Sequence, residues 1–79
     1  MKIGIKVKNI IDIQKINQIV STYSFDIWIH SKSGMVDAKS ILGMFALSLN
    51  EDLFLVLEDG TNTKELFKEL GEYVILEEE

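Results

Sequence analysis

The stretch that organises the chain is Val36-Asp37-Ala38-Lys39-Ser40-Ile41-Leu42-Gly43-Met44-Phe45-Ala46-Leu47. It predicts the end of a short strand, a tight connection, and a short helix that begins after Ser40. At this position a serine oxygen can accept hydrogen bonds from the unpaired N–H groups of the first helical turn. Because a helix start also favours negative charge, a phosphate on Ser40 is expected to be tolerated. Ser40 is therefore a candidate phosphorylation site, and a purely capping serine is the alternative.

The helix that follows Ser40 has more apolar residues than one buried face of a short helix can hold. They are Ile41, Leu42, Met44, Phe45 and Leu47. Some of them must face outward, which suggests a surface for a partner. We assign this candidate partner-binding surface to Ile41, Leu42 and Phe45, with Lys39 beside them.

The segment Lys39-Ser40-Ile41-Leu42-Gly43, followed by Met44-Phe45-Ala46-Leu47, resembles the regulatory serine segment of the HPr family. HPr is the histidine-containing phosphocarrier of the bacterial sugar phosphotransferase system. Residues 25–29 and 34–37 resemble the middle hairpin of that family, and the resemblance runs from about residue 21 to 74. It implies phosphorylation of Ser40 by an HPr-type kinase/phosphorylase. It also implies that the phosphorylated form binds a carbon-catabolite transcription regulator.

The pattern of apolar residues predicts the order β-α-β-β-α-β-α in a single domain, residues 1–79, of α+β class. The expected strands are 2–8, 25–29, 35–38 and 53–57, with a hairpin turn at 31–34. The expected helices run from Ile10 or Ile13 to Ser24, from Ser40 to about residues 49–50, and from Thr61 or Thr63 onward. Gly71 is expected to weaken or end the last helix. This order implies a four-stranded antiparallel sheet with three helices on one face, the open-faced sandwich of HPr.

Composition and charge exclude several classes of function. The chain has a net charge of −5, one histidine, and no cysteine or proline, and all eight basic residues are lysines. We therefore expect no disulfide, no metal site and no cofactor. An acidic protein with an acidic tail at 77–79 is not expected to bind nucleic acid or an anionic membrane directly. No signal peptide or long apolar run is seen, so a soluble cytoplasmic protein is expected.

The position of the HPr phosphoryl acceptor is filled by a different residue here. In that family a histidine at the start of the first helix accepts the phosphoryl group, and an arginine and a proline follow it. In this chain either Asn9 or Asp12 takes that place, and the first histidine is His30. Asn9 and Asp12 are interpreted as helix caps. His30 is expected to be exposed and without a catalytic role. We therefore expect neither phosphocarrier nor enzymatic activity.

The uncovered face of the predicted sheet is a second candidate interface. Trp28 points outward if Phe25, Ile27 and Ile29 point inward. In the last strand, either Leu53, Leu55 and Leu57 or Phe54 and Val56 must also point outward. Trp28 with Leu53, Leu55 and Leu57 is the candidate second interface, which would serve a homodimer or another protein.

Two functions are consistent with the sequence. The first is an HPr-like regulatory protein of the phosphotransferase system and carbon catabolite control, without histidine phosphocarrier activity and phosphorylated at Ser40. The alternative is an orphan interaction module of HPr fold, with no phosphotransferase role, that binds itself or another protein through Trp28 and its neighbours.

Overall fold

A computed structural model describes residues 1–75 of the chain; the acidic tail at 77–79 lies outside them. The elements in chain order are β1 (Lys2–Ile5), α1 (Ile10–Val20), β2 (Trp28–Ser31), β3 (Gly34–Asp37), α2 (Ile41–Phe45), β4 (Leu53–Val56), α3 (Lys64–Leu70) and the 3₁₀ turn η1 (Gly71–Tyr73). The strands form one antiparallel sheet in the order β1-β4-β2-β3. The predicted α+β class and four-stranded antiparallel sheet are confirmed.

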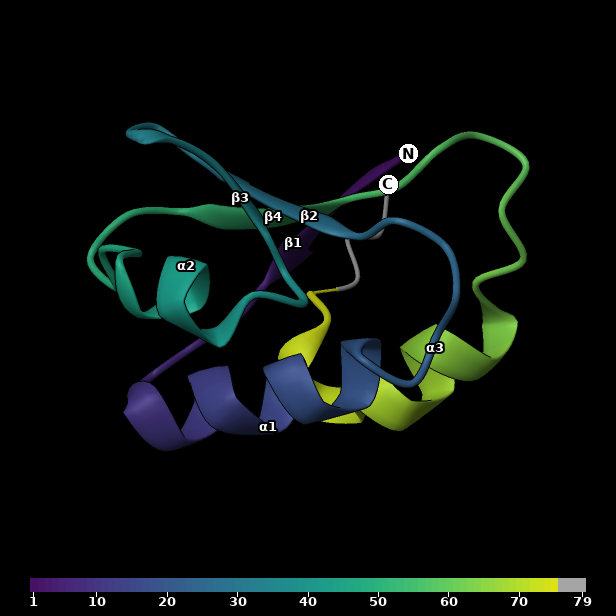
Figure 1. Ribbon diagram of the computed structural model, residues 1–79, viewed down its shortest axis with the longest axis horizontal. Coiled ribbons are helices and arrows are strands. Elements are labelled where there is room, and N and C mark those ends of the chain that lie inside the picture. The colour runs from purple at the N-terminus through teal and green to yellow at the C-terminus, as the bar shows by residue number, and fades with distance from the viewer. Residues whose placement is uncertain (76–79) are drawn as a thin grey trace.

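The three helices lie on the same face of the sheet, as Figure 1 shows. The strand register explains which side chains meet them. Leu55 pairs with Ile3 on one side and Ile29 on the other, and Ile29 also pairs with Val36. Since side chains alternate between the faces of a strand, this row of apolar side chains points together toward the helices.

The core lies between this row and the inner faces of the helices. In α1 the buried side chains are Ile13, Ile16 and Val20, which recur at helical spacing. The other helices contribute Met44, Leu66 and Leu70, all fully buried. A buried aliphatic side chain contributes about 1.5–3 kcal/mol through removal of apolar surface from water. Burial on the sheet therefore stabilises α2 and α3, which are too short to form alone.

Polar caps fix where α1 begins. The Asn9 side chain accepts a hydrogen bond from the Asp12 backbone N–H at 3.1 Å. Asp12 in turn accepts a bond from the Lys8 backbone N–H at 2.9 Å. Asn9 is therefore the N-cap, and the helix begins at Ile10, which was the earlier of the two predicted starts. It ends at Val20 rather than at the predicted Ser24.

Several other predicted boundaries are wrong by a few residues. β2 begins at Trp28 rather than at residue 25. Before the strand, Phe25 packs against Tyr23 with ring centres 5.4 Å apart. β1 ends at Ile5, short of the predicted residue 8. α2 ends at Phe45 rather than near residues 49–50, because the chain tightens into 3₁₀-type bonds and then leaves the helix. α3 ends before Gly71, as predicted; that glycine takes a φ of 50°.

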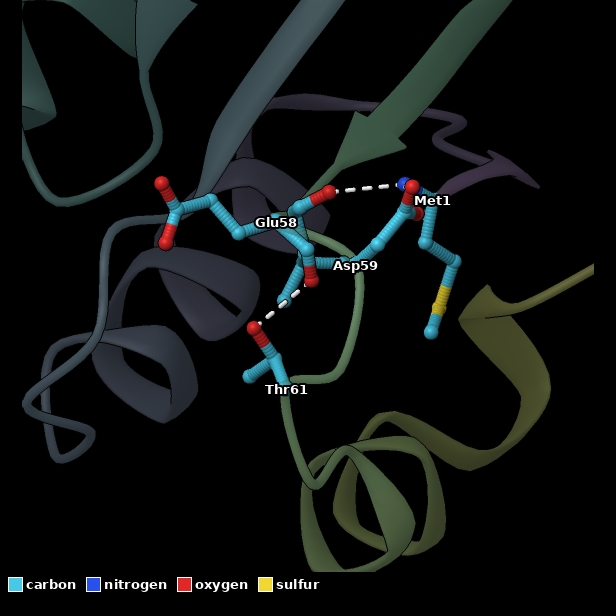
Figure 2. A network of polar contacts seen from close by, with 5 residues as sticks. Met1, Glu58, Asp59 and Thr61 are labelled. Carbon is cyan, nitrogen blue, oxygen red and sulfur yellow. Dashed lines mark hydrogen bonds and ion pairs between the residues drawn. The ribbon is translucent and has the colours of Figure 1, made fainter.

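The segment that ends at Ile75 covers one edge of the sheet, and Met1 ties down the start of β1. The Ile75 N–H donates to the Gly4 carbonyl at 2.8 Å, so the end of the described chain covers the free edge of β1. The Met1 ammonium donates to the Leu57 carbonyl and to Asp59 Oδ1, both at 2.8 Å, in the network that Figure 2 shows. This network joins β1 to the connection between β4 and α3. β3 is the other edge strand.

The N-terminus of α3 differs from the expected cap. Thr61 Oγ1 donates to the Glu58 carbonyl at 2.7 Å and so stabilises the preceding turn (Figure 2). Thr63 occupies the N-cap position but makes no capping bond through its side chain. The connection before α3 is thus held mainly by backbone turns and by the network around Asp59.

Candidate functional site

Ser40 is exposed at the N-cap of α2. Its backbone is extended there, with φ −93° and ψ 108°, and its Oγ accepts a hydrogen bond from the Gly43 N–H at 3.2 Å. The Ser40 carbonyl accepts from Met44 N, which starts the helix ladder. The predicted cap is confirmed. The same geometry leaves the hydroxyl at the surface, with its oxygen aligned on the first helical turn.

Gly43 keeps the space beside this hydroxyl open. A β-carbon built on Gly43 would lie 3.3 Å from Ser40 Oγ and 3.5 Å from Ser40 Cβ. That contact is tighter than ordinary van der Waals packing, so a side chain at this position would crowd the hydroxyl. No role for Gly43 was predicted from the sequence. Its spacing of three residues after a capping serine is the signal that could have identified it.

The turn before Ser40 is fixed by Asp37. Asp37 Oδ1 accepts a hydrogen bond from the Lys39 N–H at 2.9 Å, and the Asp37 carbonyl accepts from the Ser40 N–H, also at 2.9 Å. These two bonds turn the chain from β3 into α2 within three residues. They hold Ser40 in the position where its side chain can cap the helix.

Lys39 does not present its charge to the surface beside Ser40. The side chain is half-buried, and its Nζ donates to the Tyr23 carbonyl at 2.6 Å, just after α1. The prediction that Lys39 belongs to an outward partner surface is corrected on this point. The ammonium instead ties the start of α2 to the end of α1, because the Tyr23 carbonyl there accepts a hydrogen bond from it.

Tyr23 extends this connection to α3. Its hydroxyl donates to the Glu69 carboxylate, and this bond, with burial and the negative charges of Glu69 and Glu65, raises the pKa of Tyr23 to about 12. Lys39, Tyr23 and Glu69 therefore connect the start of α2, the end of α1 and α3. These contacts help to hold α2, a helix of only five residues, in place.

The apolar side chains of α2 divide between the core and the surface, as predicted. Met44 is fully buried, whereas Leu42 is 80% exposed and Phe45 is 43% exposed. Ile41 is half-buried and packs against the core, so its assignment to the outward surface is corrected. Leu42 and Phe45 are the outward apolar residues next to Ser40. We call Ser40, Leu42 and Phe45 the α2 surface.

Two exposed isoleucines at the start of α1 were not assigned to any surface by sequence analysis. Ile10 and Ile11 follow the Asn9 cap and are both exposed. α2 packs against α1, and Figure 1 places α2 and the start of α1 toward the same end of the molecule. The signal in the sequence is that these two isoleucines fall outside the buried stripe of α1.

Asn9 and Asp12, at the start of α1, act as capping groups. The side chain of each accepts a hydrogen bond from a backbone N–H group, as described above. His30 lies on β2 and is exposed, as predicted. Within residues 1–75 no group of three or more His, Cys, Asp or Glu side chains is placed to hold a metal ion.

The second candidate interface is partly wrong. Leu53, Leu55 and Leu57 are buried in the core, each less than 5% exposed. β4 begins in a register that pairs Leu55 with Ile29, and this turns Phe54 and Val56 to the other face. Of the two alternatives left by the sequence, the second is therefore correct. Trp28 does lie on the uncovered face, as predicted.

Comparisons with known proteins give no relative: no family model, no curated protein and no solved structure matches the chain. Among the described residues, no helix has the length and apolar character needed to cross a membrane.

Proposed function

We propose that this chain is an HPr-like regulatory protein of the cytoplasm that is phosphorylated on Ser40 and has no histidine phosphocarrier activity. The observation that carries the proposal is the exposed Ser40 hydroxyl at a helix N-cap, beside the outward Leu42 and Phe45. The sequence resemblance supplies the enzyme and the partner: an HPr-type kinase/phosphorylase and a carbon-catabolite transcription regulator.

The modification is a simple group transfer. Ser40 Oγ attacks the γ-phosphorus of ATP, the bond from that phosphorus to the bridging oxygen breaks, and ADP leaves. The hydroxyl proton passes to a base of the kinase. The phosphate oxygens then lie at the N-terminal end of α2, where negative charge is favoured.

The phosphate is expected to remain available to a partner. Lys39 is engaged by the Tyr23 carbonyl, and the chain has no arginine that could clamp the phosphate in two places. Basic residues of a partner can therefore bind the phosphate while Leu42 and Phe45 contribute apolar contact. Phosphorylation would change the surface for binding and leave the fold intact.

The deciding assay mixes purified protein, ATP and an HPr-type kinase and locates phosphate by mass spectrometry. A phosphopeptide at Ser40 that is absent in Ser40→Ala and retained in Ser24→Ala supports the proposal. Ser24 is a matched control because it is also exposed. If the protein stays unmodified while authentic HPr is labelled in parallel, the regulatory function is rejected.

The proposed lack of carrier activity has its own test. Phosphoenolpyruvate and the first enzyme of the phosphotransferase system should leave the protein unlabelled, because Asn9 and Asp12 replace the acceptor. Label on His30 or Asp12, identified from its stability to acid and base and by His30→Ala and Asp12→Asn, would contradict this part of the proposal.

The alternative function is an interaction module with no phosphotransferase role. It is favoured by one observation, the large exposed side chain of Trp28 on the face of the sheet that the helices leave uncovered. The kinase assay distinguishes the two functions: a Ser40 phosphopeptide contradicts a module with no phosphotransferase role, and an unmodified protein favours it.

A further inference from the structure

The face of the sheet opposite the helices carries two rows of side chains, and we call these eight residues the open face. The strand register sets the rows, because directly paired residues point to the same side. Across the order β1-β4-β2-β3, the first row is Lys2, Val56, Trp28 and Asp37, and the second row is Gly4, Phe54, His30 and Met35.

The centre of the open face is apolar. Trp28 on β2 is 37% exposed and Met35 on β3 is 55% exposed. Phe54 and Val56 are on β4, which lies between β2 and β1. At the β1 edge the exposed Ile75 takes the space beside Gly4, whose missing side chain would lie 3.6 Å from it. Phe54, Val56 and Trp28 thus form an apolar group on the two central strands, and His30 separates Phe54 from Met35 in the second row. An exposed apolar group rimmed by polar residues is typical of an interaction surface.

Opposite charges stand at the two ends of the first row. Lys2 is on β1 and its Nζ lies 4.5 Å from the centre of the Phe54 ring, above the sheet. Asp37 is on β3, at the other edge. When two such rows face each other in opposite order, the cation of each row lies opposite the anion of the other. A second copy of this chain supplies that reversed row.

We propose that the open face is the contact surface of a symmetric homodimer, with a two-fold axis parallel to the strands and between the facing sheets. This axis reverses the strand order of the second copy, so β1 faces the partner's β3 and β4 faces the partner's β2. Lys2 then lies opposite the partner's Asp37, and Val56 lies opposite the partner's Trp28. Each contact occurs twice, as an isologous interface requires.

The charges at the end of the sheet follow the same rule. Lys32 comes directly after β2, Asp52 comes directly before β4, and both line an open hollow of about 630 Å³. Because the axis brings β2 and β4 together, Lys32 meets the partner's Asp52. An axis across the strands would instead place Lys2 opposite Gly4 and Asp37 opposite Met35, with no complementary charge.

The interface is small, which sets the conditions of the test. Four strands about 4.8 Å apart and four residues long present a face of roughly 250 Å² in projection. Stable complexes bury about 800 Å² of accessible surface on each partner. The dimer is therefore expected to have a weak affinity and to be reversible. The proposal does not depend on phosphorylation of Ser40.

Analytical ultracentrifugation of the full chain from about 10 μM to about 1 mM brackets this affinity. The wild type should change from monomer to dimer over this range. Trp28→Ser should raise the dissociation constant at least tenfold, since it removes the largest apolar contact twice. Phe45→Ser is the matched control: it removes an exposed aromatic from the helix side and should leave the dissociation constant unchanged.

Charge reversal tests the orientation. Lys2→Glu and Asp37→Lys should each weaken the dimer by roughly tenfold, because each creates two like-charge contacts. The double variant should return to within about twofold of the wild type, since the pairs are restored with reversed sign. Thermal melting of each variant checks that it is folded. Asp37→Lys also removes the hydrogen bond that Asp37 accepts from the Lys39 N–H, so its effect on the dimer has two sources. Lys2→Glu does not touch that bond and must therefore weaken the dimer by itself.

Three results would overturn the proposal. A wild type that is monomeric near 1 mM shows that the open face does not bind a second copy. A dimer that Phe45→Ser abolishes and Trp28→Ser leaves intact uses the helix side instead. A double charge variant that is no tighter than the single variants rejects the strand-parallel two-fold axis.

Discussion

Replacing Ser40 by alanine removes a single hydrogen bond that the structure defines clearly. Ser40 Oγ accepts from the Gly43 N–H at 3.2 Å, and the residue is otherwise exposed. The alanine side chain is smaller and fits the same backbone conformation. The change therefore tests the cap without creating a cavity in the core.

The expected cost follows from the size of the lost interaction. Substitution of a capping serine by alanine costs about 1 kcal/mol of stability. For a chain of 79 residues the entropy of unfolding is about 170 cal/mol/K, at about 2.1 cal/mol/K per residue. The melting temperature of Ser40→Ala should therefore fall by about 6 °C. Ser40→Asp keeps an acceptor and adds a negative charge at the helix start, so it should melt near or above the wild type.

Thermal unfolding followed by circular dichroism measures these shifts directly. Ser24→Ala is the control, because Ser24 is exposed, lies outside every helix, and should change stability by less than about 0.5 kcal/mol. A Ser40→Ala variant that melts within about 1 °C of the wild type would show that the cap is not formed in solution. A Ser40→Asp variant less stable than Ser40→Ala would show that negative charge is not tolerated there, and phosphorylation would then disturb the fold.

Three further predictions concern groups near the site and the chain start. The raised pKa of Tyr23, about 12, means that the unfolded chain loses the phenolic proton at lower pH than the folded chain, so stability should fall from about pH 10 to about pH 12. Burial and the charges of Asp12 and Glu72 also raise the pKa of Tyr73, so Tyr23→Phe should reduce this slope in urea titrations without removing it. The Met1 ammonium lowers the pKa of Asp59, so stability should fall as the pH drops below about 4, and Asp59→Asn should flatten this acid-side decline in the same titrations. Gly43→Ala should slow phosphorylation of Ser40, measured as the initial rate of phosphate incorporation, because the new methyl group would lie 3.3 Å from the hydroxyl; a wild-type rate would exclude this crowding.

Local signals in the sequence predicted two helix caps, the end of the last helix and the hairpin turn, whereas the predicted threonine cap of α3 is wrong. Asn9 and Ser40 are polar residues placed directly before apolar helices, and both cap through their side chains. Gly71 ended α3 because it takes a positive φ that other residues adopt at a cost. Gly34 likewise opens β3 with a φ of 144° after a two-residue turn. In each case one residue type has a physical role that depends only on its neighbours.

The orientation of β4 could not be deduced in the same way. Residues 53–57 are all apolar, so alternation gives no indication of which side chains are buried. The pairing of Leu55 with Ile3 and Ile29 decides it, and that pairing depends on strands far apart in the sequence. The predicted partner-binding surface beside Ser40 included two residues too many for a related reason. Whether Ile41 and Lys39 face outward depends on the packing of α2 against α1, which the local sequence does not encode.

The two proposed surfaces meet at Asp37, and this has a consequence for regulation. The Asp37 carbonyl accepts a hydrogen bond from the Ser40 N–H at 2.9 Å, whereas the strand register places Asp37 in the first row of the open face. A phosphate on Ser40 adds negative charge at the helix start, where negative charge stabilises the existing structure. The same charge lies three residues from Asp37, the anion of the proposed dimer contact, and salt screens an interaction of this kind. Phosphorylation of Ser40 is thus expected to alter the binding of a partner at α2 and to act on the contact between two copies through charge, without a change in structure.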